Sequence, residues 1–292
     1  MIRLLWTQKQ DIGPPLRTQH VMAYDSMRGQ TVLFGGKLNA GGGLTNDTWE
    51  WDGGNWTQVH DVGPPARIGH AMAFDSARGR TVCFGGLANE QDTGSTFNDT
   101  WEWDGTDWTE MANTGPGGRS FHTMAYDSTR GRTVLFGGQV LGAFLGDTWE
   151  WDGATWTQAA GTGPSPRDAC GSAYDTTRQR LVIYGGETLN GTQIVNVGET
   201  WELAVGSWTQ MSMLGPGPIV GPLMAYVAAY TLLYNPADGT TWSWDGAHWT
   251  ERQKLGPGMQ APASLVYDSQ RKRAVLCGAG QTQTTWELAE VP

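Results

Sequence analysis

The chain has 292 residues, of which 39% are hydrophobic and only 16% are charged, and it contains 42 glycines and 16 tryptophans. That apolar content is enough for a large core and excludes a disordered chain. The net charge is −10, no dense Lys/Arg tract occurs, and no apolar run approaches the ~20 residues of a membrane helix, which excludes nucleic acid and membrane as main partners.

The cysteines and the first residues indicate the compartment. Cys83, Cys170 and Cys277 lie far apart and form no C-x-x-C pair. An odd, sparse set of cysteines fits a reducing compartment and no disulfide framework. The first five residues lead directly into Trp6-Thr7-Gln8, so no apolar segment of a signal peptide is recognised. We therefore expect a cytoplasmic protein.

Six repeats follow one another along the chain. A block that begins with Gly-Pro starts at residues 13, 63, 115, 163, 215 and 256. The tryptophans fall on three repeated positions, and the sixth repeat lacks only its third tryptophan, which Trp6 supplies. The repeats predict blades at residues 13–58, 63–110, 115–158, 163–210, 215–251 and 256–292, with residues 4–8 completing the last.

Each repeat predicts four short strands. In the second repeat they cover residues 70–74, 81–84, 99–103 and 108–110, and the hairpin signal Asp104-Gly105 separates the last two. Four strands in a period of about 50 residues are typical of a propeller blade. We therefore predict an all-β, six-bladed β-propeller of four-stranded antiparallel blades. The N-terminal strand pairs into the last blade and closes the ring, and residues 1–292 form one domain.

A double glycine follows the second strand in four of the six repeats. The double glycines are Gly35-Gly36, Gly85-Gly86, Gly137-Gly138 and Gly185-Gly186, whereas Asn235-Pro236 and Gly278-Ala279 depart from the pattern. Together with the later tryptophan pair, this pattern resembles the kelch-repeat family over the whole chain. The resemblance implies several functions: a peptide-binding adaptor, a metal-dependent enzyme, whose metal-binding patterns are absent here, or an isomerase like the six-bladed sialic acid mutarotases.

The two faces of such a ring differ in this sequence. The turns between the first and second and between the third and fourth strands share one face and repeat almost unchanged. The other face carries varied loops, which are long or medium at residues 37–46, 87–98, 139–146 and 187–198 and short in the last two repeats. Variable loops on a rigid scaffold are where binding usually occurs, so we expect a pocket on the varied face, walled by the first four blades.

Four arginines share one repeat position on the varied face: Arg17, Arg67, Arg119 and Arg167, with Ile219 and Gln260 in the last two repeats. A partial ring of guanidinium groups would bind a carboxylate, a phosphate or an acidic sugar. Alternatively, each arginine stacks on a tryptophan or holds its own loop through backbone carbonyls. Lys37 and Glu187, which belong to varied loops, are further ligand-binding candidates.

Four acidic residues begin the third strand on the same face: Asp47, Asp99, Asp147 and Glu199. Near the arginines they could act as general acid or base groups. An acidic residue at a strand entry also commonly caps its own turn, and this alternative stays open.

Three histidines share the position where the first strand begins: His20, His70 and His122. Imidazoles that converged on the axis could hold zinc or iron. Side chains of the innermost strand are expected to point into the packing between blades, so buried histidines are the alternative. We predict no cofactor and favour no metal.

Fold alone does not define function, so two hypotheses remain. The first is a ligand-binding propeller that recognises a small organic molecule, anionic if the arginines bind it, or a short peptide on the varied face. The second is a cofactor-free enzyme of the isomerase, lyase or cyclase type, with Asp or Glu as acid and base and Arg as the anion anchor. A closed ring has no free sheet edge to drive dimerisation, so we expect a monomer.

Overall fold

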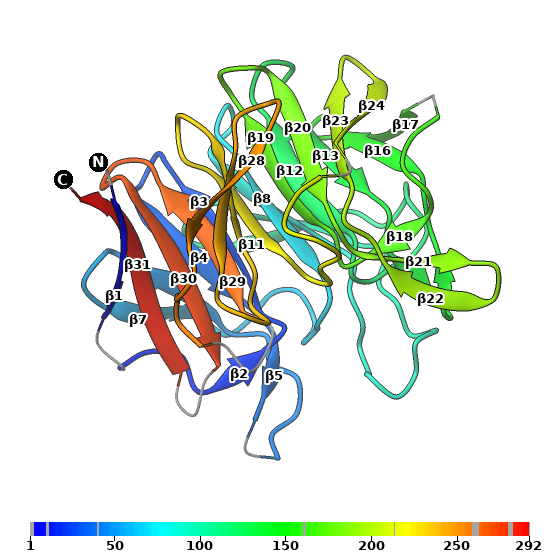
Figure 1. Ribbon diagram of the computed structural model, residues 1–292. Helices are drawn as coiled ribbons and strands as arrows, with labels where there is room; N and C mark the ends of the chain where they lie inside the picture. Colours follow the sequence, from blue (N-terminus) through cyan, green and yellow to red (C-terminus); the bar gives the residue numbers. More distant parts are fainter. Residues whose placement is uncertain are drawn as a thin grey trace.

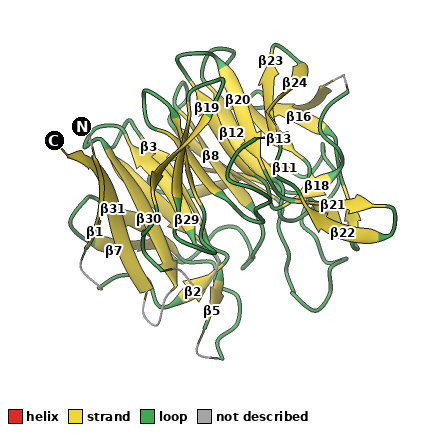
Figure 2. Ribbon diagram, in the orientation of Figure 1, coloured by secondary structure: helices red, strands yellow, loops and turns green. Residues whose placement is uncertain are grey.

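The computed structural model describes residues 3–9, 12–39, 41–159, 162–212, 214–258, 263–279 and 283–291 (Figure 1). Strands, turns and loops make up this part of the chain, and Figure 2 shows no helix in it. Accordingly, within the described residues no helix is long and apolar enough to cross a membrane.

The described residues form six four-stranded antiparallel sheets, which confirms the predicted fold class. From the innermost strand outward they are β3 (Val21–Asp25), β4 (Gln30–Phe34), β6 (Thr48–Trp51) and β7 (Trp56–His60) in blade 1; β8 (Ala71–Asp75), β9 (Arg80–Phe84), β10 (Thr100–Trp103) and β11 (Trp108–Ala112) in blade 2; β12 (Thr123–Asp127), β13 (Arg132–Phe136), β16 (Thr148–Trp151) and β17 (Trp156–Ala159) in blade 3; β19 (Gly171–Asp175), β20 (Arg180–Tyr184), β23 (Thr200–Ala204) and β24 (Ser207–Ser212) in blade 4; β25 (Leu223–Tyr226), β26 (Thr231–Tyr234), β27 (Thr241–Trp244) and β28 (Trp249–Gln253) in blade 5; and β29 (Ser264–Asp268), β30 (Arg273–Ala279), β31 (Gln283–Val291) and β1 (Arg3–Gln8) in blade 6.

The blades close into a ring. Each innermost strand contacts the innermost strand of the next blade, and β29 of the last blade contacts β3 of the first. The N-terminal strand β1 pairs antiparallel with β31, with Trp6 opposite Leu288. The predicted closure by the N-terminal strand is therefore confirmed, and the two described ends lie side by side (Figure 1).

The hydrophobic core lies between neighbouring blades. One cluster joins Ala73, Val82 and Phe84 of blade 2 to Leu135 and Trp151 of blade 3. The tryptophan of the second repeated position is at most 1% exposed in the four blades that carry it, at Trp51, Trp103, Trp151 and Trp244. Because each sheet buries both faces against its neighbours, the strands are apolar in consecutive residues, as in β9 and β13.

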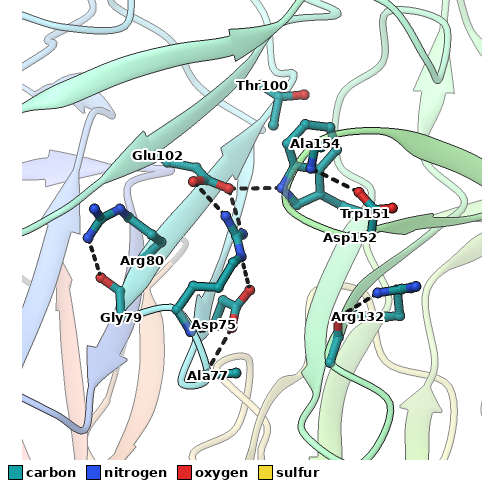
Figure 3. A network of polar contacts seen from close by, with 12 residues as sticks. Asp75, Ala77, Gly79, Arg80, Thr100, Glu102, Arg132, Trp151, Asp152 and Ala154 are labelled. Atoms are coloured by element: carbon teal, nitrogen blue, oxygen red, sulfur yellow. Dashed lines mark hydrogen bonds and ion pairs between the residues drawn. The ribbon is translucent and has the colours of Figure 1, made fainter.

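Ion-pair networks join the blades on the face with the uniform turns. Arg78 bonds Asp75 at the end of β8 and Glu102 of β10, at 2.7 and 2.6 Å. Figure 3 shows Glu102 also accepting a hydrogen bond from the indole of Trp151 in the next blade, at 2.9 Å. Equivalent networks centre on Arg28 and Arg178. This face is therefore occupied by structural contacts.

Short extra strands build up the varied face. β2 (Arg17–Thr18) pairs with β5 (Lys37–Leu38), and β14 (Gln139–Val140) with β15 (Ala143–Phe144). In blade 4, β18 (Arg167–Asp168), β21 (Glu187–Asn190) and β22 (Gln193–Asn196) form a three-stranded sheet whose hairpin projects from the ring (Figure 2). The regions predicted as loops at residues 139–146 and 187–198 thus contain hairpins, of which the second pairs with β18.

Candidate functional site

An axial cavity of about 790 Å³ runs along the innermost strands of all six blades. Small and apolar side chains line most of its length, among them Ala73, Ala125, Ala173 and Met224. At the varied face it is lined by Gln19, Gly69, Phe121, Ala169, Val220, Gly221, Pro236 and Ala237. A cavity of this size is large enough for a small organic molecule.

Backbone hydrogen bonds form a collar at the varied-face end of the cavity. The collar comprises Gly69, Phe121, Ala169 and Gly221, one residue from each of blades 2 to 5. The N–H groups of Phe121, Ala169 and Gly221 each donate to the carbonyl of the preceding collar residue, at 2.7, 2.9 and 2.8 Å. Phe121 and Ala169 have φ of 55° and 48°, a left-handed conformation that is costly for residues with a side chain. The collar therefore fixes the mouth of the cavity.

Aromatic side chains line the opposite end of the cavity, at Tyr24, Phe74, Tyr126, Tyr174, Tyr226 and Tyr267. The hydroxyl of Tyr174 donates to Thr129 at 2.8 Å, in the turn of the preceding blade. Tyr226 makes the equivalent bond to Thr177 at 2.6 Å. Burial and the contact with Asp127 raise the pKa of Tyr174 to about 12, so this phenol stays neutral. These tyrosines join neighbouring blades.

The four predicted arginines are buried and ion-paired. Arg67 is fully buried, and its Nη1 and Nη2 donate to the two carboxylate oxygens of Asp99, both at 2.7 Å. The same guanidinium also donates to the carbonyls of Pro65 and Gly85, at 2.9 Å each. The remaining pairs are Arg17 with Asp47, Arg119 with Asp147 and Arg167 with Glu199, at 2.6 to 2.7 Å.

The four predicted acid/base residues are thus the partners of the four arginines. Burial disfavours the charge of Asp47, but the bonds from Arg17, Thr45 and Trp49 outweigh it and hold the pKa below its usual value. In Asp147 and Glu199, too, the hydrogen bonds from the paired arginine and the neighbouring tryptophan outweigh burial and lower the pKa. None of these eight described residues lines the axial cavity. The geometry favours the alternative in which each arginine holds its own loop.

Blades 5 and 6 support that interpretation. In blade 2 the indole of Trp101 donates to Asp99 at 2.8 Å. In blade 5 the arginine position is Ile219, and the aspartate position is Thr240, whose hydroxyl accepts from Trp242 at 3.1 Å. Thr284 plays the same part for Trp286 in blade 6, where Gln260 lies outside the described residues. The acid is absent where the arginine is absent, as a structural pair requires.

The three histidines are buried between blades. Nε2 of His20 lies 3.1 Å from the carbonyl of Cys277, and His70 and His122 pack edge-on against Phe34 and Phe84. Burial, and secondarily a nearby arginine, lowers the pKa of His20 and of His122 to about 3. Within the described part of the chain no three His, Cys, Asp or Glu side chains form a group that could hold a metal.

Lys37 and Glu187 both lie on the varied face but apart from each other. Lys37 pairs with Glu90 from the loop of blade 2. Glu187 begins β21 and lies opposite Asp168 of β18. The predicted loop residues are therefore divided between the blade 1–2 side and the blade 4 side of the varied face, and neither lines the axial cavity.

Asp168 is the residue that the sequence analysis missed. Its side chain is buried, and Oδ2 accepts a 2.7 Å hydrogen bond from Nε2 of Gln139 in blade 3. Burial and then the charge of Glu187 raise its pKa to about 7, against the effect of Gln139. Asp168 immediately precedes the collar residue Ala169. One signal was present: the equivalent residues Thr18, Ile68, Ser120 and Val220 are all uncharged.

The comparisons with known proteins agree with this architecture. Residues 22–228 match the family described as the KLHDC2/KLHL20/DRC7 Kelch-repeats domain. The solved structure of YjhT is similar with a TM-score of 0.74 over 96% of this chain and 99% of that chain, at 12% identity, which shows a shared fold. No curated protein sequence matches the chain. The family match covers well over half of the residues, and the chain belongs to the kelch-repeat family.

Proposed function

We propose that this propeller binds a small organic molecule in its axial cavity, entered through the collar on the varied face. The observation that carries the proposal is the cavity itself, which has a volume of about 790 Å³ and is lined by all six blades. Pockets that hold small ligands have typically 300–1,000 Å³ and a mostly apolar lining with a few polar groups at one end. At the varied-face end the side chain of Gln19 supplies such a polar group, and Asp168 immediately precedes the lining residue Ala169.

The support for an anionic ligand is weaker than the sequence indicated. All four arginines of the varied face are bonded to carboxylates, and Lys37 is paired with Glu90. The proposal therefore covers a small organic molecule without a required negative charge. Three buried free cysteines support a reducing compartment, so we place this function in the cytoplasm.

The enzyme hypothesis is the second candidate, and Asp168 favours it. A carboxyl whose pKa is raised to about 7 is suited to give and take a proton at neutral pH. In this version Asp168, and none of the arginine-bound carboxylates, would be the acid/base group of an isomerase, lyase or cyclase. Asp168 does not itself line the axial cavity, so the reacting group of the substrate would lie at the varied-face end, next to Ala169.

A retention experiment tests the first proposal. The full chain is mixed with a metabolite extract, filtered to remove unbound compounds, and the retained compounds are identified by mass spectrometry. The Val220→Trp variant places a large side chain at the mouth, where Val220 is 38% exposed. The matched control is Val59→Trp on the outer strand β7, where Val59 is 37% exposed.

We expect a compound that the wild type and Val59→Trp retain and that Val220→Trp loses. A compound that is consumed during incubation, and is not consumed by an Asp168→Asn variant, would establish the enzyme instead. Retention by all three proteins, or by none, would contradict binding in the axial cavity.

A further inference from the structure

Buried carboxyl groups in this propeller are paired with cations, with one exception among the described residues. Nine buried carboxyls each lie within 3.0 Å of an arginine or lysine nitrogen: Asp25, Asp75, Asp99, Glu102, Asp127, Asp175, Glu202, Asp268 and Glu287. Asp168 is also buried, with 3% of its surface exposed, and it has no cationic partner among the described residues. A buried carboxylate without a cation is costly, so this site is distinctive.

The hydrogen bonds of Asp168 are incomplete. Its Oδ2 accepts from Gln139, but no described residue donates a hydrogen bond to Oδ1. The nearest arginine in sequence, Arg167, is bonded to Glu199 and to Ser165 instead. The site thus has acceptor capacity that the described side chains leave unused.

A second carboxyl lies beside the first. Glu187 is the pairing partner of Asp168 across the antiparallel strands β18 and β21. Its side chain is half-buried, so it is the part of the pair that solvent reaches. Two carboxyls side by side repel each other when both are ionised, unless a cation or a proton lies between them.

On the basis of the proposed small-molecule function, we propose that Asp168 and Glu187 form a subsite for a protonated amine of the ligand. Asp168 and Glu187 do not line the axial cavity themselves, but Asp168 immediately precedes Ala169, which does, and it accepts a hydrogen bond from Gln139 of blade 3. The subsite therefore lies next to the mouth and outside the cavity lining. An ammonium group donates up to three hydrogen bonds and supplies the missing positive charge. The apolar part of the same ligand would enter the axial cavity.

Protons compete with the amine for this subsite. Burial and Glu187 raise the pKa of Asp168 to about 7, so below neutral pH a proton neutralises the buried carboxyl. An ammonium group that binds there favours the ionised form and displaces that proton to solvent. By linkage, the amine binds more tightly above pH 7 than below it.

Three probes of equal length and different charge test the proposal. Hexylammonium, hexanol and hexanoate are titrated calorimetrically into the full chain at about pH 5.5 and about pH 8. The variants are Asp168→Asn and Glu187→Gln, with Glu251→Gln as a control of equal charge change on the exposed outer strand β28. The carboxyl carbon signal of Asp168 is followed by NMR in parallel.

At about pH 8 we expect hexylammonium to bind the wild type and Glu251→Gln roughly tenfold or more tightly than hexanol, with hexanoate weakest. Asp168→Asn and Glu187→Gln should bind hexylammonium no better than hexanol, and the wild-type preference should disappear at the lower pH. Hexanol binding as tightly as hexylammonium would overturn the amine subsite and leave the cavity function intact. Absence of hexylammonium binding would also overturn it, whereas the cavity function fails only by the retention experiment.

Discussion

At the scale of single residues, the repeats provide an internal control for the role of each side chain. The arginine and the acid of the varied face occur together in blades 1 to 4, and blade 5 has Ile219 and Thr240 in their places. Both arrangements give the tryptophan of the third strand an acceptor for its N–H group. A buried ion pair and an apolar–hydroxyl pair are therefore alternative solutions at one repeat position.

Exchanging one solution for the other in blade 2 is a direct test. We expect Arg67→Ile alone to lower the free energy of unfolding by about 3–5 kcal/mol, because Asp99 is left as a buried, unpaired charge. Adding Asp99→Thr should restore a large part of that loss, since the double variant reproduces blade 5. Urea unfolding of the two single variants and the double variant measures the coupling. Additive losses would show that the pair is not a structural unit.

Asp168 predicts a pH dependence of stability. Its pKa is about 7 in the fold against about 4 in an unfolded chain, so the folded state holds the proton more tightly between these values. Relative to Asp168→Asn, the wild type should therefore lose stability as pH rises from about 4 to 7, by an amount on the order of 4 kcal/mol, after which the difference levels off. The buried histidines, whose lowered pKa values stabilise the fold as pH rises through the same range, are common to both proteins and cancel in this difference. Parallel unfolding curves of both proteins across this range would contradict the raised pKa.

At the scale of structural elements, the collar combines strain with hydrogen bonding. Its residues Phe121 and Ala169 adopt left-handed conformations that glycine would adopt at lower cost, as Gly69 and Gly221 do. The strain persists because each N–H group bonds the preceding blade. A hydrogen-bonded arc of backbone across blades 2 to 5 results at the mouth, and the side chains that it carries differ from blade to blade.

Two opposite substitutions in the collar check this account. Ala169→Gly should raise the free energy of unfolding by roughly 1 kcal/mol, because it removes the side chain from a left-handed residue. Gly69→Ala should lower it by at least as much, since its Cβ would lie only 3.1 Å from the ring of Phe121. Thermal unfolding of both variants gives the signs. A destabilised Ala169→Gly would show that the collar is not strained.

At the scale of the whole molecule, ring closure depends on one strand from each end of the chain. Trp6 of β1 is 8% exposed and belongs to the core cluster between blades 5 and 6, where its ring packs edge-on against Tyr234. Its neighbour Leu5 is 51% exposed. Substitutions at these two positions therefore distinguish stabilisation of the closed ring by side-chain packing from stabilisation by backbone pairing alone.

We expect Trp6→Ala to lower the free energy of unfolding by about 3–5 kcal/mol, as for other large aromatic side chains removed from cores. The control Leu5→Ala should change it by less than about 1 kcal/mol. Denaturant unfolding followed by tryptophan fluorescence measures both. Equal effects of the two substitutions would contradict a packed seam.

Much of the architecture was predictable because it repeats. Counting tryptophans assigned Trp6 to the last blade, and the structure pairs its strand with β31. The partners of Arg67 were not predictable, since Asp99 lies 32 residues away and its pairing depends on the folded blade. The hairpin β21–β22 was read as a loop because its first partner, β18, is a two-residue strand of another segment.

Asp168 was not predicted from the sequence because it does not repeat. Comparing repeated positions identifies the residues that the blades share, whereas the residues around the mouth of the cavity differ from blade to blade. The burial of this carboxyl depends on Gln139 from a neighbouring blade and on Glu187 from a hairpin. A comparison of the six blades position by position for the odd residue would have found it.

The antiparallel seam also has a mechanical consequence. Arg3 lies opposite Val291, so the two chain ends leave the seam at the same end of the β1–β31 pair. A force that pulls the ends apart therefore loads the outermost hydrogen bonds first and opens the pair one bond at a time, like a zipper. The ring should resist pulling far less between its own ends than between attachment points within two blades on opposite sides. A tether that pulls on both ends would therefore load the molecule along the direction in which its mechanical resistance is lowest.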